Sequence, residues 1–204
     1  KGEAFAAFAR ELDAALKNEY AVTDPGVVLE CVPSSADRAV SPERTAVLLR
    51  ALAVLPHGVE AMDTDFPGLV QTSLNMGVVR LDDAGLHVTF SIRSSIASRK
   101  EMLAQRVRAA AELAGGTVTE RGVYPGWQYR RDSQFRETLL AAYKDLTGKD
   151  GVVEATHGGL ECGLFMEKLP GLDAVSLGPD IPDIHSVRER LGVSSVARTY
   201  ALVC

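Results

Sequence analysis

The stretch QTSLNMGVVRLDDAGLHVTFSIRS, residues 71–94, decides the fold of this chain. In its second half Val88, Phe90 and Ile92 alternate with polar residues, which is typical of a strand with one buried face. The turn DDAG joins this half to residues 71–81, a second β-prone run. The stretch therefore predicts an antiparallel hairpin.

Helical patterns surround the hairpin. Apolar side chains recur at helical spacing in residues 4–20, and helix start and stop signals bracket residues 41–56 and 98–113. Short β-prone runs predict further strands at 27–32 and 117–124. This order of elements suits an α+β domain, in which an antiparallel sheet carries helices on one face.

The pattern changes after the tripeptide PGW at 125–127. Helices are predicted from Ser133, Leu160 and Val193, and they alternate with predicted strands at 152–155 and 173–178. Such alternation is typical of α/β units. We therefore expect two parts, residues 1–128 and residues 129–204.

The composition excludes several classes of protein. A net charge of −5 with no basic block argues against a nucleic-acid partner, and no apolar run reaches the roughly 18 residues of a membrane span. Three widely spaced cysteines and no recognisable signal peptide favour a reducing compartment, so we expect a cytoplasmic protein. The chain opens on Lys1, directly into a helical pattern, and we expect it to be part of a longer polypeptide.

His185 is the first candidate for a site residue. It lies in a loop that follows the predicted strand 173–178, and ligands of open α/β sheets bind at that edge. Neutral imidazole is a common metal ligand, although a lone histidine is also found as an ordinary surface or core residue.

The turn THGG and Arg93 are the other candidates. Gly158 and Gly159 either let the backbone approach an anionic ligand before a helix or form a tight turn with positive φ. Glu161 and Cys162 are expected to start that helix, Glu161 favoured by the helix dipole and Cys162 as a buried apolar residue. Arg93 faces away from the apolar side of its strand, where it either grips a carboxylate bidentately or stays solvated.

Six features in one order carry a family resemblance: TSLNMGVV (72–79), SIRSS (91–95), GVYPGWQ (122–128), HGGLECGLF (157–165), VSLGPDIPDIHS (175–186) and Glu189. Together they resemble the aminoacyl-histidine dipeptidases (Xaa-His dipeptidases, or peptidase D), which are carnosinase-like dinuclear zinc peptidases. The resemblance implies that residues 1–128 are most of an α+β lid domain, incomplete at its N-terminus. Residues 129–204 would be the C-terminal portion of an α/β catalytic domain that holds two metal ions.

The resemblance also implies roles for single residues. His185 matches a metal ligand and Glu189 a residue that supports it, although the residues between them depart from the family's usual pattern. Arg93, Gly158 and Gly159 match groups that bind the substrate's terminal carboxylate. His157 matches the histidine of this turn, whose role stays open.

The family's remaining metal ligands and its general base have no match in residues 1–204 and are expected upstream. We therefore expect no catalytic base in this chain, an inactive fragment, and a full-length zinc enzyme that uses a metal-activated water to cleave carnosine-like Xaa-His dipeptides. A homodimer formed through the lid is implied as well. Two alternatives remain: a dimerisation or regulatory α+β module that uses a sheet edge, and a related aminoacylase or tripeptidase.

Overall fold

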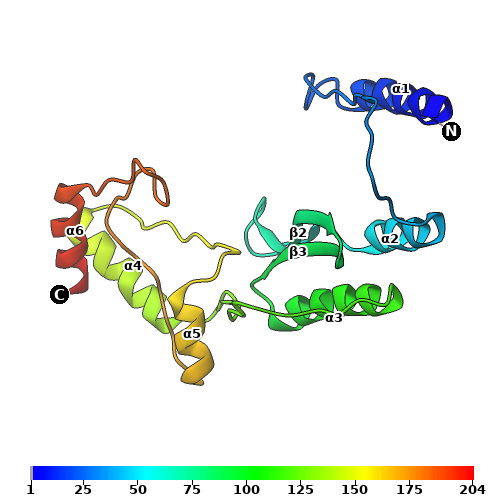
Figure 1. Cartoon of the computed structure of the whole chain (residues 1–204). Helices are drawn as coiled ribbons and strands as arrows, with labels where there is room; N and C mark the ends of the chain where they lie inside the picture. The colour runs from blue at the N-terminus through cyan, green and yellow to red at the C-terminus, as the bar shows by residue number, and fades with distance from the viewer. Residues whose placement is uncertain (1) are drawn as a thin grey trace. The chain divides into compact units, whose positions relative to one another are not determined.

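The computed structural model describes residues 2–204. Its elements are α1 (Gly2–Glu19), α2 (Pro42–Val54), β1 (Gly58–Met62), β2 (Val70–Asp82), β3 (Gly85–Ser94), α3 (Ala97–Leu113), α4 (Gln134–Thr147), α5 (Glu161–Lys168) and α6 (Val193–Val203) (Figure 1). The chain forms two compact units, one ending at Arg44 and the other running from Thr45 to Cys204. None of the helices within residues 2–204 is long and apolar enough to cross a membrane.

The first unit consists of α1 and a segment that folds back on it. The Asp13 carboxylate accepts a hydrogen bond from the backbone N–H of Leu29 at 2.9 Å and pairs with Lys17 at 2.8 Å. The hydrogen bond from Lys17, followed by that from Leu29, holds the pKa of Asp13 below its usual value. The predicted strand at 27–32 is not formed, because this segment pairs with no other strand in the described part of the chain.

The second unit contains an antiparallel sheet in the order β1-β2-β3. The β2–β3 hairpin confirms the prediction from residues 71–94. Its turn is held by Asp82, whose Oδ1 accepts the backbone N–H groups of Ala84 at 2.9 Å and Gly85 at 3.2 Å. Gly85 has a φ of 141°, which glycine adopts readily. The sequence pattern does not predict β1, whose five residues are too few to show a period.

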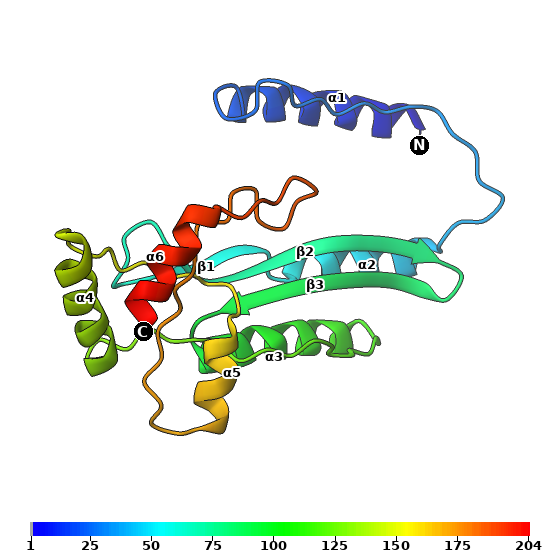
Figure 2. The ribbon, with the colours of Figure 1, turned by 90° about the vertical axis from the view of Figure 1, so that its left-hand side faces the viewer.

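Helix α3 covers one face of this sheet (Figures 1 and 2). Leu103 and Val107 pack against Leu74, and these three residues form the buried cluster. The surrounding half-buried side chains are Leu55, Phe90 and Ile92. An ion pair between Arg106 and Glu60, with 2.9 Å between its atoms, joins α3 to β1. The arrangement confirms the predicted antiparallel sheet with helical cover on one face.

The other predicted strands are absent from the described residues. The segments 117–124, 152–155 and 173–178 pair with no neighbouring strand. A strand is stable only when its backbone groups bond to a partner, and the β-prone composition of a segment cannot reveal whether that partner exists. Side chains of α3 hold the first of these segments instead: Arg108 pairs with Glu120, and Lys100 donates to the carbonyl oxygen of Tyr124.

Helix α4 begins where the sequence predicts. The Ser133 hydroxyl accepts a hydrogen bond from the backbone N–H of Arg136 at 3.0 Å, and the helix ends at Gly148 in the left-handed conformation. Asp173, distant in sequence, accepts hydrogen bonds from the backbone N–H of Phe135 at 3.0 Å and from the Ser133 hydroxyl at 2.7 Å. These bonds hold the pKa of Asp173 below its usual value and fasten the 173–178 segment to the start of α4.

We expect the Asp173→Asn variant to melt at a lower temperature than the wild-type protein at neutral pH. Because the pKa of Asp173 is lower in the folded state, its charge stabilises the fold above the unfolded pKa of about 3.9, and this contribution is lost as the pH falls through the folded value. The difference in melting temperature should therefore shrink toward acidic pH, as measured by circular dichroism between pH 7 and pH 3. Asp145→Asn, at an exposed position of the same helix, is the control. An equal fall in the melting temperature of Asp173→Asn at pH 7 and at pH 3 would contradict the stabilising role of the Asp173 charge.

Candidate functional site

Arg93 lies on the face of the sheet opposite to the α3 contact. It pairs with Ser73 across the β2–β3 ladder, and its side chain is exposed, whereas the neighbouring Ile92 packs toward the buried cluster. Asn75 and Ser91 form the next pair of the same register on that face. The strand therefore presents a guanidinium group, always charged, among polar side chains.

The end of β3 contacts the PGW segment through Gly126. A Cβ atom on Gly126 would lie 2.6 Å from the carbonyl oxygen of Ser94 and 2.7 Å from that of Ser95. Gly163 of α5 also lies against the PGW segment. A Cβ atom on Gly163 would lie 3.2 Å from the carbonyl oxygen of Pro125 and 3.3 Å from that of Gly126. The end of the strand that carries Arg93 and the start of α5 therefore meet at one backbone junction.

Gly159 is needed at this junction for space. Neither Gly158 nor Gly159 has a positive φ, so the alternative of a tight turn in the left-handed conformation is wrong. A Cβ on Gly159 would overlap the ring of Tyr124, only 2.8 Å from its Cε1 atom. Gly158 donates its backbone N–H to the Thr156 hydroxyl at 3.1 Å, which closes the turn. Gly159 thus makes room for Tyr124, and the close approach of this turn to an anionic ligand stays a prediction.

Glu161 and Cys162 form the first turn of α5, as predicted. Cys162 is partly buried, and this burial raises the pKa of its thiol. The pKa of Tyr124 is also raised, first by burial and then by the nearby Glu161 and Cys162. A raised pKa leaves less of the Cys162 thiol ionised at neutral pH, which agrees with its expected place as a partly buried residue of the helix.

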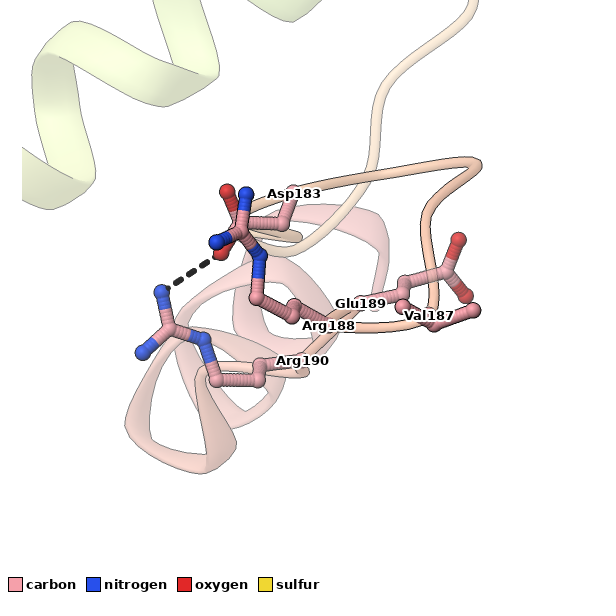
Figure 3. A pocket seen from close by; sticks show the side chains of 5 residues that line it. All are labelled: Asp183, Val187, Arg188, Glu189 and Arg190. Atoms are coloured by element: carbon pink, nitrogen blue, oxygen red, sulfur yellow. Dashed lines mark hydrogen bonds and ion pairs between the residues drawn. The ribbon is translucent and has the colours of Figure 1, made fainter.

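His185 lies at the exposed tip of the loop 180–192. Its φ of 63° is left-handed, as is that of Asp183 at 57°. The backbone N–H of His185 donates to Glu189 Oε2 at 2.8 Å, so Glu189 contacts the backbone of the histidine. Figure 3 shows a hollow lined by other residues of this loop, with Glu189 pointing away from the ion pair between Arg190 and Asp183, whose atoms are 2.8 Å apart.

His185 suits the role of a single metal ligand. Its imidazole is exposed, and within residues 2–204 its ring nitrogens form no hydrogen bond or ion pair. The described residues hold no group of three or more His, Cys, Asp and Glu side chains able to bind a metal ion. Because a zinc site needs three or four ligands, the other ligands would have to come from outside this part of the chain.

The structure brings some candidates together and leaves others apart. Glu189 contacts His185, and the Gly158–Gly159 turn lies beside the junction that Arg93's strand reaches. In the described part of the chain no hydrogen bond or ion pair links the His185 loop to Arg93 or to that turn. Tyr124 and Gly126 are further residues of the junction that local patterns could not assign, because their contacts lie far away in sequence.

The chain corresponds in sequence and structure to a segment of the peptidase D-like dipeptidases, which confirms the resemblance. It is 33% identical to the cytosol non-specific dipeptidase of Escherichia coli (strain K12) over 92% of its own length, and it spans 39% of that protein. Against the crystal structure of the aminoacylhistidine dipeptidase from Vibrio alginolyticus it has 30% identity and a TM-score of 0.87, covering 99% of this chain and 41% of that one.

A more distant structure shares the fold. Aminopeptidase PepT from Bacillus cereus is 20% identical, with a TM-score of 0.58 over 78% of this chain and 43% of that one. No protein-family model matches the sequence.

We expect Gly159→Ala to destabilise the protein through its clash with Tyr124. The destabilisation should be much smaller in a Tyr124→Ala background, because the added methyl group then meets no ring. Chemical denaturation of the wild type, both single variants and the double variant gives the coupling free energy, which we expect to reach about 1–3 kcal/mol. Gly158→Ala, whose added Cβ would lie 3.3 Å from the Thr156 hydroxyl, is the matched control. Additive effects of the two substitutions would show that the ring is not what Gly159 accommodates.

Proposed function

We propose that the full-length protein is a metal-dependent dipeptidase that hydrolyses dipeptides with a C-terminal histidine. The observation that carries this proposal is the match to the aminoacylhistidine dipeptidase from Vibrio alginolyticus, which extends over 99% of this chain at a TM-score of 0.87. In the proposal, residues 1–128 belong to a lid and residues 129–204 to the C-terminal part of the catalytic domain.

Each candidate residue has a role that its position supports. The exposed Arg93 guanidinium would bind the terminal carboxylate of the dipeptide, and the backbone at Gly158 and Gly159 would lie against the same group. His185 would be one ligand of a zinc pair. Glu189 would support His185 by accepting a hydrogen bond from the backbone N–H of the histidine. Zinc, when bound, would lower the pKa of a water molecule and so provide the nucleophile. We assign no catalytic base to this chain, and expect it to be inactive as a fragment.

The assembly and location are part of the proposal. β3 is an outer strand of the sheet order β1-β2-β3, and an exposed strand edge is suited to pairing with a second copy through the lid. A cytoplasmic location agrees with the name of the Escherichia coli relative, a cytosol dipeptidase. We expect no nucleic-acid or membrane partner.

A broader specificity is the second candidate. The Escherichia coli relative is named a non-specific dipeptidase, so acceptance of many C-terminal residues is a concrete alternative to a histidine preference. Further alternatives are an aminoacylase or tripeptidase activity, or a module that only dimerises. Activity measured on a panel of dipeptides, tripeptides and N-acyl amino acids separates them from a dipeptidase.

We expect the purified full-length protein to cleave Ala-His and β-Ala-His faster than Ala-Ala, a tripeptide or an N-acetyl amino acid. Chelation of the metal should abolish this activity, and added zinc should restore it. Release of free histidine measured by chromatography gives kcat/KM for each substrate. Equal rates for Ala-His and Ala-Ala would favour the non-specific alternative. Hydrolysis that persists after complete metal removal would exclude the metal-dependent mechanism.

We expect Arg93→Gln to lower kcat/KM for Ala-His by about 10- to 100-fold, because a charge-assisted hydrogen bond contributes roughly 1.5–3 kcal/mol. Ala-His amide has no terminal carboxylate for Arg93 to bind. The substitution should therefore change the kcat/KM for this amide little. Arg80→Gln, at another exposed arginine of the hairpin, is the matched control. An Arg93→Gln enzyme with wild-type kcat/KM would remove Arg93 from the substrate site.

A further inference from the structure

The loop that carries His185 is closed at its base by a buried serine. Ser195, in the first turn of α6, is only 3% exposed. Its hydroxyl accepts the backbone N–H of Asp180 at 2.8 Å and donates to the carbonyl oxygen of Gly192 at 2.5 Å. Gly192 in turn donates its N–H to the carbonyl oxygen of Asp180 at 2.8 Å. We call these three residues the Ser195 clasp.

The clasp leaves no spare room. A Cβ on Gly192 would lie 3.3 Å from both the carbonyl oxygen of Asp180 and the hydroxyl of Ser195. The nearby ion pair between Arg198 and Asp180, with 3.0 Å between its atoms, is exposed on both sides, and such pairs contribute little. The two ends of the loop are therefore held together by the two hydrogen bonds of the buried Ser195 hydroxyl and by the backbone bond between Gly192 and Asp180. A buried hydroxyl is costly to leave without its partners.

The tip of the loop needs this constraint. His185 and Asp183 both have left-handed φ angles, and a non-glycine residue keeps such a conformation only where its surroundings impose it. Local bonds impose it in part: His185 N–H donates to Glu189, and the Ser186 hydroxyl donates to the carbonyl oxygen of Asp183 at 2.7 Å. Between this tip and the clasp, the backbone N–H of Arg190 donates to the carbonyl oxygen of Pro182 at 3.1 Å, so the clasp is the outermost of the contacts that join the two arms of the loop.

We propose that Ser195 is a positioning residue for His185. By bonding to both ends of the loop, its hydroxyl keeps the strained tip in one conformation and so holds the imidazole in one place. Ser195 is buried and its hydroxyl is engaged with Asp180 and Gly192, so it would act through the loop and not as a ligand. The inference rests on the proposed role of His185 as a metal ligand.

The test is a zinc titration of the metal-stripped full-length protein in competition with a chromogenic chelator. We expect Ser195→Ala to weaken zinc binding about 10- to 100-fold, the range found when a residue that orients a ligand is removed. Ser194→Ala, at the exposed neighbouring serine, is the matched control and should bind zinc like the wild type. His185→Ala should lose more affinity than either.

A variant that is destabilised far from the loop shows whether a loss of zinc affinity comes from the position of His185 or from a general loss of stability. Leu103→Ala removes a fully buried side chain on the sheet side of the unit and should lower the melting temperature without changing zinc affinity. Should Ser195→Ala fail to fold, Gly192→Ala disturbs the same clasp and is expected to weaken zinc binding in the same way. Unchanged affinity in the folded clasp variant, with a clear loss in His185→Ala, would overturn the inference and leave the proposed function intact. Unchanged affinity in His185→Ala would instead remove His185 from the metal site.

Discussion

The close backbone contact between Gly126 and the end of β3 is the constraint on which the relation between the sheet and the C-terminal helices depends. No side chain fits between Gly126 and the carbonyl oxygens of Ser94 and Ser95. Gly163 then brings α5 against the same segment, and Gly159 admits the ring of Tyr124 beside it. Gly126 and Gly163 therefore let backbone pack on backbone, and Gly159 leaves room for an aromatic ring beside them.

The two main candidate groups are held in place by different means. Arg93 stands on a paired strand whose register is specified by the buried face of the sheet, because a slip of one residue would turn Ile92 outward. His185 stands on an irregular loop with strained backbone, held by the Ser195 clasp at its base and by Glu189 at its tip. In the proposed function His185 would have to meet the fixed bond length of a metal ligand, and contacts that hold its loop in one conformation would serve that role.

Much of this arrangement could be predicted from local patterns. The alternation at Val88, Phe90 and Ile92 predicted the hairpin, and Ser133 predicted the start of α4 from its capping hydroxyl. The segments 152–155 and 173–178 were predicted as strands because their composition is β-prone, yet they remain unpaired in the described residues. β-Propensity indicates that a segment can adopt an extended conformation. Whether the segment forms a strand depends on a partner that lies elsewhere in the chain.

By itself the sequence determined the antiparallel hairpin, the outward face of Arg93, the start of α5 at Glu161 and the membership of the glycine pair in a turn. Each of these depends on neighbours within a few residues, where periodicity and capping act. Only the tertiary structure decided that Gly159 makes room for Tyr124, that Asp173 caps α4, and that Ser195 closes the loop of His185. Those contacts join residues far apart along the chain, and the steric exclusion and hydrogen bonds between them arise only once the chain has folded.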